Sequence, residues 1–234
     1  MIDDLHKFPT TPHLTWLGPE QLRGDKVLTE IERSAFVSGD VALEEKIDGA
    51  NLGISFSTGG ELRFQNRGNW LEPPFRGQWR PLRDWAARHE PALRERLCPG
   101  VVLFGEWCYA RHSVPYSRLP DWFLAFDVYD SIEDRFWSLQ RRNALLGGSG
   151  ISCVHQVATL RLPTIAELID HLNVSSKYGD VQIEGLYLRI EENDWLRARA
   201  KLVNPDFVQA IDKHWSRSGI VPNQIDGNAV VGSS

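Results

Sequence analysis

The positions of apolar residues along the chain predict several short strands with helices inserted between them. Apolar runs of strand length occur at 40–57, 60–67, 101–108, 122–129, 181–190 and 196–203. The first range holds two strands around the turn Asp48-Gly49. Apolar residues at helical spacing predict helices over 81–97, 137–146 and 164–172. Because these helices do not alternate regularly with the strands, the pattern favours an α+β fold.

Local signals in the second half of the chain predict where two helices begin. Thr164-x-x-Glu167 has the spacing of a capping box. A short helix is expected from Asn204, with Pro205 at its first position. The residues after Arg217 are polar and small, so we expect one domain over 1–217 and a flexible C-terminal tail over 218–234.

Composition and charge narrow the class of protein without naming a function. The chain has 234 residues, of which 42% are hydrophobic and 24% charged, enough for a sizeable core. A net charge of −5 does not indicate a nucleic-acid partner, although a local basic groove is compatible with it. The longest apolar runs are too short to span a membrane, and the acidic N-terminus lacks the apolar segment of a signal peptide.

The cysteine pattern argues against structural zinc and favours a reducing compartment. Cys98, Cys108 and Cys153 are scattered and odd in number, and no Cys-x-x-Cys pair occurs. We therefore expect free thiols and a cytoplasmic protein without a membrane partner.

Charged residues interrupt strands that are otherwise apolar. Glu106 ends the run 101–105, Glu184 lies within 181–190, and Lys201 lies within 196–203. Each alone fits a strand residue that faces solvent. Together with Lys46 they predict a shared polar cleft, because a buried charge is costly unless it is paired or binds a ligand.

Lys46 belongs to the heptapeptide Glu45-Lys46-Ile47-Asp48-Gly49-Ala50-Asn51. A lysine beside an acid, on a strand that leads into a glycine turn, can act as a covalent nucleophile. Taken alone, the same string also fits a strand end followed by an Asp-Gly turn.

Several ordered motifs decide between these interpretations. They are Lys46-Ile47-Asp48-Gly49, Phe104-Gly105-Glu106, Phe126-Asp127-Val128-Tyr129, Glu184-Gly185-Leu186-Tyr187-Leu188-Arg189 and Ala200-Lys201-Leu202-Val203. In this order they resemble the covalent nucleotidyltransferase superfamily of ATP-dependent RNA and DNA ligases and mRNA capping enzymes. Glu45, Asn51 and Arg67 make the chain most similar to nick-sealing RNA ligases. The resemblance implies an ATP-grasp-like nucleotidyltransferase fold, with mainly antiparallel sheets flanking a nucleotide cleft and helices at the periphery.

The resemblance also implies a reaction and its catalytic residues. Lys46 attacks the α-phosphate of ATP and becomes a lysyl-adenylate; AMP then passes to a 5′-phosphate end and is displaced by a 3′-hydroxyl. A free lysine has a pKa of about 10.4, so nearby cations and a metal must favour the amine. Lys201 is the expected cation and α-phosphate clamp. Glu184 is the expected ligand of Mg²⁺ or Mn²⁺, which prefer carboxylate oxygen.

Other residues are implied to bind the nucleotide. Glu106 resembles the acid that accepts a hydrogen bond from the ribose, and Arg67 resembles the arginine that reaches ribose or phosphate. Phe126 is expected to stack on adenine, a role compatible with a place in the core.

Four further residues carry less defined roles by resemblance. Glu45 is placed near the purine, and Asn51 near the ribose or a metal-bound water. Arg199 is assigned to phosphate or to the nucleic-acid end. Asp48 either binds ribose or shapes the turn.

Three functions stay open from the sequence. An ATP-dependent RNA ligase is favoured, with ATP and RNA ends or nicks as substrates. A DNA ligase or a capping-type transferase is the second, and a nucleotide- or RNA-end-binding module without turnover is the third. The stretch after Lys201 is too short for an OB barrel, which has five strands. Either a partner protein supplies that nucleic-acid-binding domain, or the grip on the nucleic acid is weak.

Overall fold

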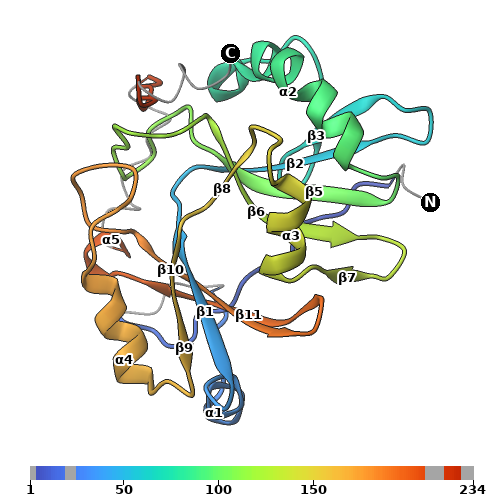
Figure 1. The fold of residues 1–234 in the computed structure, drawn as a ribbon. Helices are drawn as coiled ribbons and strands as arrows, with labels where there is room; N and C mark the ends of the chain where they lie inside the picture. Colours follow the sequence, from blue (N-terminus) through green and yellow to red (C-terminus); the bar gives the residue numbers. More distant parts are fainter. Residues whose placement is uncertain (1–3, 19–24, 209–218, 228–234) are drawn as a thin grey trace.

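Two sheets form the centre of the molecule in the computed structural model, which describes residues 4–18, 25–208 and 219–227 (Figure 1). The four-stranded sheet is antiparallel and has the order β11 (Trp195–Val203), β10 (Gly185–Glu192), β1 (Asp40–Lys46), β9 (Gln156–Arg161). The seven-stranded sheet has the order β4 (Trp70–Leu71), β3 (Leu62–Gln65), β2 (Ala50–Phe56), β5 (Val101–Trp107), β6 (Phe123–Asp130), β7 (Arg135–Phe136). Strand β8 (Ser152–Cys153) runs parallel to β6, and the other pairings are antiparallel.

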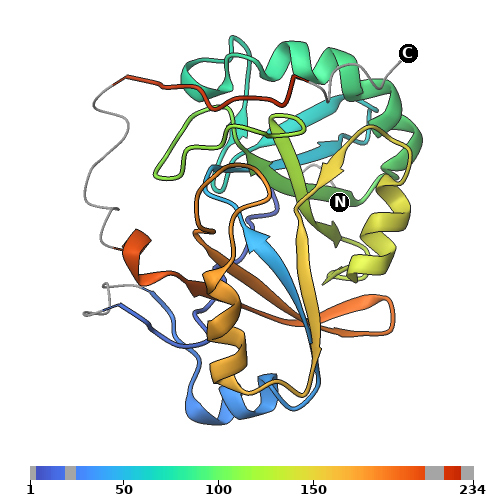
Figure 2. The ribbon, with the colours of Figure 1, turned by 60° about the vertical axis from the view of Figure 1, so that its left-hand side comes forward.

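Helices pack around the two sheets (Figures 1 and 2). They are α1 (Glu30–Phe36), α2 (Leu82–Arg96), α3 (Leu139–Leu146), α4 (Ile165–Asp170) and α5 (Pro205–Val208), with short 3₁₀ turns η1 (Gly77–Trp79) and η2 (His171–Asn173). The capping box at Thr164 is confirmed, and a second one at Thr29 begins α1. No helix in the described ranges has the length and apolar composition to cross a membrane.

The α+β class with mainly antiparallel sheets is confirmed, and each predicted strand range contains a strand. The strands on either side of Asp48-Gly49 do not form a hairpin, since β1 and β2 belong to different sheets. The strand predicted over 181–190 begins only at Gly185, so Glu184 lies just before it. Helix α1 and strand β9 were not predicted, because both are short and partly exposed.

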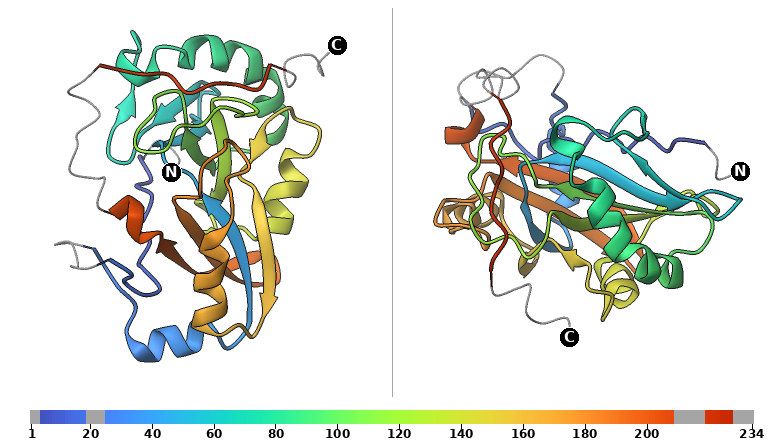
Figure 3. Two further views of the ribbon diagram at one scale, coloured as in Figure 1. Left: turned by 90° about the vertical axis from the view of Figure 1, so that its left-hand side faces the viewer. Right: turned by 90° about the horizontal axis from the view of Figure 1, so that it is seen from above.

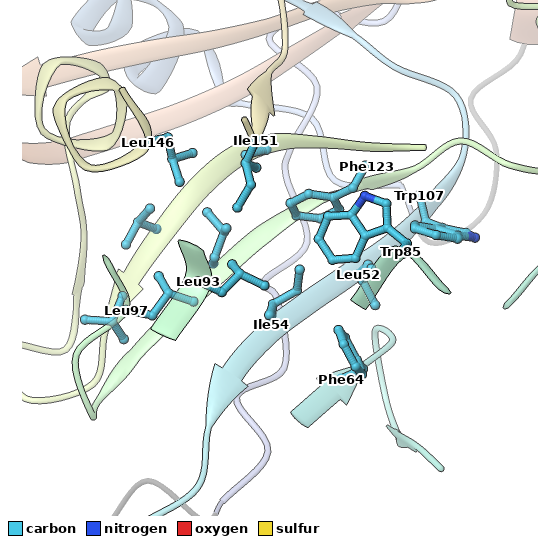
Figure 4. Close-up of a cluster of buried hydrophobic side chains, with 14 of the residues drawn as sticks. Leu52, Ile54, Phe64, Trp85, Leu93, Leu97, Trp107, Phe123, Leu146 and Ile151 are labelled. Carbon is cyan, nitrogen blue, oxygen red and sulfur yellow. The ribbon is translucent and has the colours of Figure 1, made fainter. Parts of the chain in front are cut away.

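Each sheet has its own hydrophobic core. Trp85 and Leu93 of α2 pack on Leu52, Ile54 and other residues of the seven-stranded sheet (Figure 4). On the four-stranded sheet, β1, β10 and β11 each direct alternate apolar residues toward α1, α4 and η2. These residues are Val41, Leu43, Leu186, Leu188, Ile190, Ala198, Ala200 and Leu202.

The intervening residues of the same strands carry the charges, because successive side chains of a strand point to opposite faces. Glu44 and Lys46 alternate with Leu43, and Arg199 and Lys201 alternate with Ala200. These charged groups therefore lie together on one face of the four-stranded sheet, opposite the face that packs in the hydrophobic core.

A buried network of carboxylates and arginines joins the two sheets. Asp127 of β6 pairs with Arg189 of β10 and, at 3.0 Å, with Arg199 of β11. Arg142 of α3 lies 2.7 Å from Glu44 of β1. Burial alone raises the pKa of Asp127, but the two arginine charges outweigh it and hold the pKa below its ordinary range.

Part of the expected C-terminal tail is packed against the domain. Asn223 is buried, and residues 219–227 make backbone hydrogen bonds with the segment 109–119. The expectation of a loose tail from residue 218 therefore fails for 219–227, while 228–234 lie outside the described residues. Composition gave no signal of this packing, because the bonds use backbone groups and one asparagine.

We predict that Asp127→Asn lowers the free energy of unfolding by about 3 kcal/mol, because it leaves buried arginine charge uncompensated. Urea unfolding at pH 7 measures this loss. Asp180→Asn is the matched control, since Asp180 pairs with Arg118 at 2.8 Å on the surface, and it should leave the unfolding midpoint almost unchanged. Equal losses in the two variants would contradict the structural role of Asp127.

Candidate active site

A pocket of about 660 Å³ lies where the chain passes from β1 into β2, and so from one sheet to the other. Its lining includes most of the residues that the sequence predicts as site residues, namely Glu45, Lys46, Asp48, Asn51, Arg67, Glu106, Phe126 and Lys201. The strand register explains part of this grouping, since Lys46 pairs with Gly185, Asn51 with Glu106, and Lys201 with Tyr187.

Lys46 ends β1 and forms an ion pair with Glu184. Its Nζ lies 2.6 Å from both Oε1 and Oε2 of Glu184. A Cβ at Gly185 would lie 2.2 Å from the Leu202 carbonyl oxygen, so glycine at this position allows the close approach of β10 and β11 next to Glu184. The bidentate contact makes Lys46 and Glu184 one electrostatic unit.

The protonation state of Lys46 follows from this pair. Burial lowers the pKa of Lys46, but the Glu184 carboxylate, assisted by Asp48 and Glu106, outweighs burial and raises the pKa above its ordinary 10.5. In this state Lys46 is an ammonium ion and not yet a nucleophile. The family resemblance predicted that neighbouring cations favour the amine, and here the neighbouring carboxylates act in the opposite direction.

Lys201 lines the same pocket as Lys46 and contacts Asp25, an acid that was not predicted from the sequence. Its Nζ is 3.4 Å from Oδ1 of Asp25, which is also 3.6 Å from Nε2 of His13. Burial, together with the charge of Lys46, lowers the pKa of Lys201. Burial and the Lys201 charge lower the pKa of His13 to about 4, so His13 is neutral near pH 7.

Asp48 is fixed by the loop 112–116. Its Oδ2 accepts hydrogen bonds from the backbone N–H groups of Ser113 and Val114 at 2.6 and 3.0 Å. Its own N–H donates to the Tyr116 hydroxyl at 2.8 Å. A Cβ at Gly49 would lie 2.7 Å from the Trp107 carbonyl oxygen, so the turn requires glycine. These contacts fit a turn-shaping role for Asp48, and ribose binding by Asp48 stays a prediction, since Asp48 also lines the pocket.

Glu106 and Asn51 are neighbours across β5 and β2. Burial raises the pKa of Glu106 to about 8, although the Lys46 charge acts in the opposite direction. Oδ1 of Asn51 is buried and has no hydrogen-bond partner among the described residues. A protonated carboxyl and an unpaired acceptor on one wall are suited to bind hydroxyl groups of a ligand. Arg67 follows β3 and reaches the same pocket from an exposed position.

Phe126 and Tyr187 provide the aromatic part of the pocket. Their ring centroids are 6.2 Å apart at an interplanar angle of 48°. The carbonyl oxygen of Phe126 accepts a hydrogen bond from Arg142 at 2.6 Å, so the buried charge network fixes this strand position. Phe126 also packs edge-on against Phe8, so it belongs both to the pocket lining and to a core cluster.

Two predicted residues, Glu45 and Arg199, have their hydrogen-bond or ion-pair partners outside the pocket lining. Glu45 alternates with Lys46 on β1 and accepts hydrogen bonds from the Ser176 hydroxyl at 2.5 Å and the Lys177 N–H at 3.1 Å. Arg199 does not line the pocket; it pairs with Asp127 and lies over the rings of Phe8 and Phe136.

Other lining residues were missed. They are Phe8, Thr10, Thr11, Asp25, Gln78, Trp79 and Val154. The N-terminal members carry no strand or helix periodicity. They reach the site because the backbone of 12–14 bonds to Lys201 of β11.

The sequence was compared with models of known protein families. A model of the RNA ligase family matches residues 39–203, which include both lysines and both strands that carry them. The chain belongs to the RNA ligase family. This confirms the resemblance found in the sequence motifs. A search of curated proteins found no match.

Solved structures of RNA ligases have a similar fold. A Naegleria gruberi RNA ligase variant with AMP and Mn is 18% identical, with a TM-score of 0.61, and the alignment covers 88% of this chain and 58% of that one. An archaeal ATP-dependent RNA ligase is also 18% identical, with a TM-score of 0.58, over 86% of this chain and 48% of that one. The chain thus spans about half the length of these RNA ligases, and the likeness is one of fold.

The raised pKa of Glu106 predicts how the stability of this RNA ligase family member depends on pH. The folded state keeps the proton up to about pH 8, while the unfolded state loses it near the ordinary value of 4.5. Folding stability should therefore decrease between these two pH values, relative to Glu106→Gln, which cannot ionise. Thermal unfolding of both proteins from pH 5 to 9 tests this, and a constant difference in melting temperature would refute it.

The ion pair predicts the reactivity of Lys46. Glu184→Gln removes the main charge that raises the lysine pKa, so Lys46 should acetylate several-fold faster at pH 8; each unit of pKa decrease raises the amine fraction about tenfold. Mass spectrometry after brief treatment with acetic anhydride measures the rate. The exposed Lys177 is the internal control, and an unchanged ratio of Lys46 to Lys177 labelling would contradict the pairing.

Proposed function

We propose that this protein is an ATP-dependent RNA ligase that forms a lysyl-AMP intermediate on Lys46. The observation that carries the proposal is the Lys46–Glu184 pair at a pocket between two sheets, with Lys201 in the same lining, in a member of the RNA ligase family. An amine at a strand end, facing a pocket that can admit a nucleotide, is the group that covalent adenylation needs.

The adenylation step follows from these residues. Nζ of Lys46 attacks the α-phosphorus, a P–N bond forms, and the bond to pyrophosphate breaks. Lys46 first loses a proton to water, which requires the ion pair with Glu184 to open. Polyphosphate that binds Lys201 has to displace Asp25, and the Lys201 charge then favours the amine form of Lys46.

Glu184 is the residue that would hold Mg²⁺ or Mn²⁺. No group of three or more His, Cys, Asp or Glu side chains converges on a metal position within the described ranges. Mg²⁺ commonly uses one or two carboxylates together with substrate phosphates, so a single glutamate beside the phosphate position fits it. When bound, the ion supplies charge neutralisation at the phosphoryl oxygens and competes with Lys46 for Glu184.

We place the nucleoside against the walls that the structure describes. Phe126 and Tyr187 offer faces for adenine, and Glu106, Asn51 and Arg67 offer polar groups for ribose and phosphate. Glu45 shapes the purine side through its bonds with 176–177. Arg199 is proposed to act indirectly, through Asp127, and not on phosphate. A nucleotide held between two sheets in this way corresponds to the ATP-grasp-like arrangement expected from the motifs.

The later steps pass AMP to a 5′-phosphate and join it to a 3′-hydroxyl. We propose RNA ends or nicks as the acceptor and a partner protein as a source of further nucleic-acid contacts. We propose the cytoplasm as the site of action, on the scattered and odd-numbered cysteines of the sequence.

Labelling with α-³²P ATP tests the proposal. Incubation with Mg²⁺ or Mn²⁺ followed by denaturation should leave an acid-labile label on the protein with ATP and not with GTP. The label should be absent in Lys46→Ala, which lacks the nucleophile, and retained in Lys177→Ala, an exposed lysine outside the pocket.

Three outcomes separate the alternatives. Labelling by GTP instead would indicate a capping-type transferase. No label with any nucleotide or metal would leave only a binding module and sink the ligase proposal. A chase of the adenylate with nicked RNA, nicked DNA and single strands identifies the acceptor.

A further inference from the structure

The C-terminal segment 219–227 lies along the loop 108–119, which we call the site loop (Figures 2 and 3). Arg111 N–H donates to the Val221 carbonyl at 2.8 Å, and Leu119 N–H donates to the Gln224 carbonyl at 3.0 Å. In return, Gln224 N–H donates to the Tyr116 carbonyl at 3.0 Å. The site loop is thus held along most of its length by backbone bonds to a distant part of the chain.

Asn223 is the buried side chain at the centre of this contact. Its Oδ1 accepts a hydrogen bond from the Tyr116 N–H at 2.9 Å. Its Nδ2 donates to the Cys108 carbonyl at 2.8 Å and lies 3.4 Å from the Ala110 carbonyl. The amide side chain therefore satisfies three backbone groups of the site loop, which would otherwise be buried at a cost.

The other side of the site loop holds the motif that contains Lys46. The Tyr116 hydroxyl accepts from the Asp48 N–H at 2.8 Å, and the Ser113 and Val114 N–H groups donate to the Asp48 carboxylate. A continuous path of hydrogen bonds therefore runs from Asn223 through Tyr116 to Asp48, two residues beyond Lys46. Residues 47–49 belong to no strand, so the site loop supplies contacts that a sheet does not give them.

We propose that Asn223 is a positioning residue for Lys46, acting through Tyr116 and Asp48. This inference rests on the proposed function, in which Lys46 attacks ATP. Asn223 does not line the pocket, so it has no part in binding the nucleotide. Its loss should therefore reduce the rate of attack and leave the ATP concentration at half-maximal rate almost unchanged.

Single-turnover adenylation and hydrogen exchange test the inference together. Asn223→Ala should slow lysyl-adenylate formation at saturating ATP about tenfold or more, because small misplacements of a reacting group are costly. The amides of the site loop and of 47–50 should exchange faster in the same variant. Gln224→Ala is the matched control, since its side chain is exposed and its bonds to the site loop come from the backbone; it should change neither quantity.

Tyr116→Phe provides a second variant that leaves the C-terminal segment intact. It removes only the acceptor for the Asp48 N–H, so it should slow adenylation while the exchange of 219–227 stays normal. In the double variant, the two effects should combine to less than the product of the single effects, because both act on one path. If Asn223→Ala proves too unstable to assay, Tyr116→Phe alone tests the path, and normal adenylation in it would overturn the positioning role.

The outcomes distinguish the two proposals. Normal adenylation in Asn223→Ala, or independent effects of the two substitutions, would overturn the positioning role. A rise in the half-saturating ATP concentration at an unchanged maximal rate would also overturn it. An unmodified protein that forms no adenylate would refute the proposed function itself, while exchange of 47–50 would still show whether Asn223 orders that segment.

Discussion

The pairing of Asp127 with Arg189 and Arg199 is the interaction on which the architecture of the site depends. One buried carboxylate of the seven-stranded sheet is shared by two arginines of the four-stranded sheet. Removing charge from water is costly, so the two sheets are held in the one arrangement that satisfies all three groups. The same network holds the Phe126 carbonyl through Arg142 and so extends to the pocket wall.

The pocket lies next to this network because both use the charged face of the same strands. On β1, Glu44 belongs to the buried network, and Lys46, two residues later, lines the pocket. On β11, Arg199 belongs to the network, and Lys201, two residues later, lines the pocket. At one end of the face Glu44, Asp127 and Arg189 are buried, and Arg199 is mostly buried, so these ion pairs are structural. At the other end the pairs of Lys46 and Lys201 adjoin a cavity, where a ligand can replace the carboxylates.

The sequence predicted that Lys46 and Lys201 share one cleft, but it did not predict Asp25 as the acidic partner of Lys201. Lys46, Glu184 and Lys201 were identified because charge within apolar strands has few structural explanations. Arg199 was assigned to the ligand by resemblance to the family motif. It precedes Lys201 by two residues on a strand, which puts both side chains on one face. That face is shared with the buried network, and Asp127, far away in the sequence, binds Arg199 there.

The sequence by itself determined the strand pattern, the family motifs and the candidate site residues, since these follow from local periodicity and residue type. Only the tertiary structure decided that β1 and β2 enter different sheets, that Lys46 is held as an ammonium by Glu184, and that Asn223 reaches the loop behind Asp48. These features depend on contacts between segments far apart in the chain. Such contacts leave no repeating pattern in the sequence, because one hydrogen bond or ion pair involves only a single residue from each of the two segments.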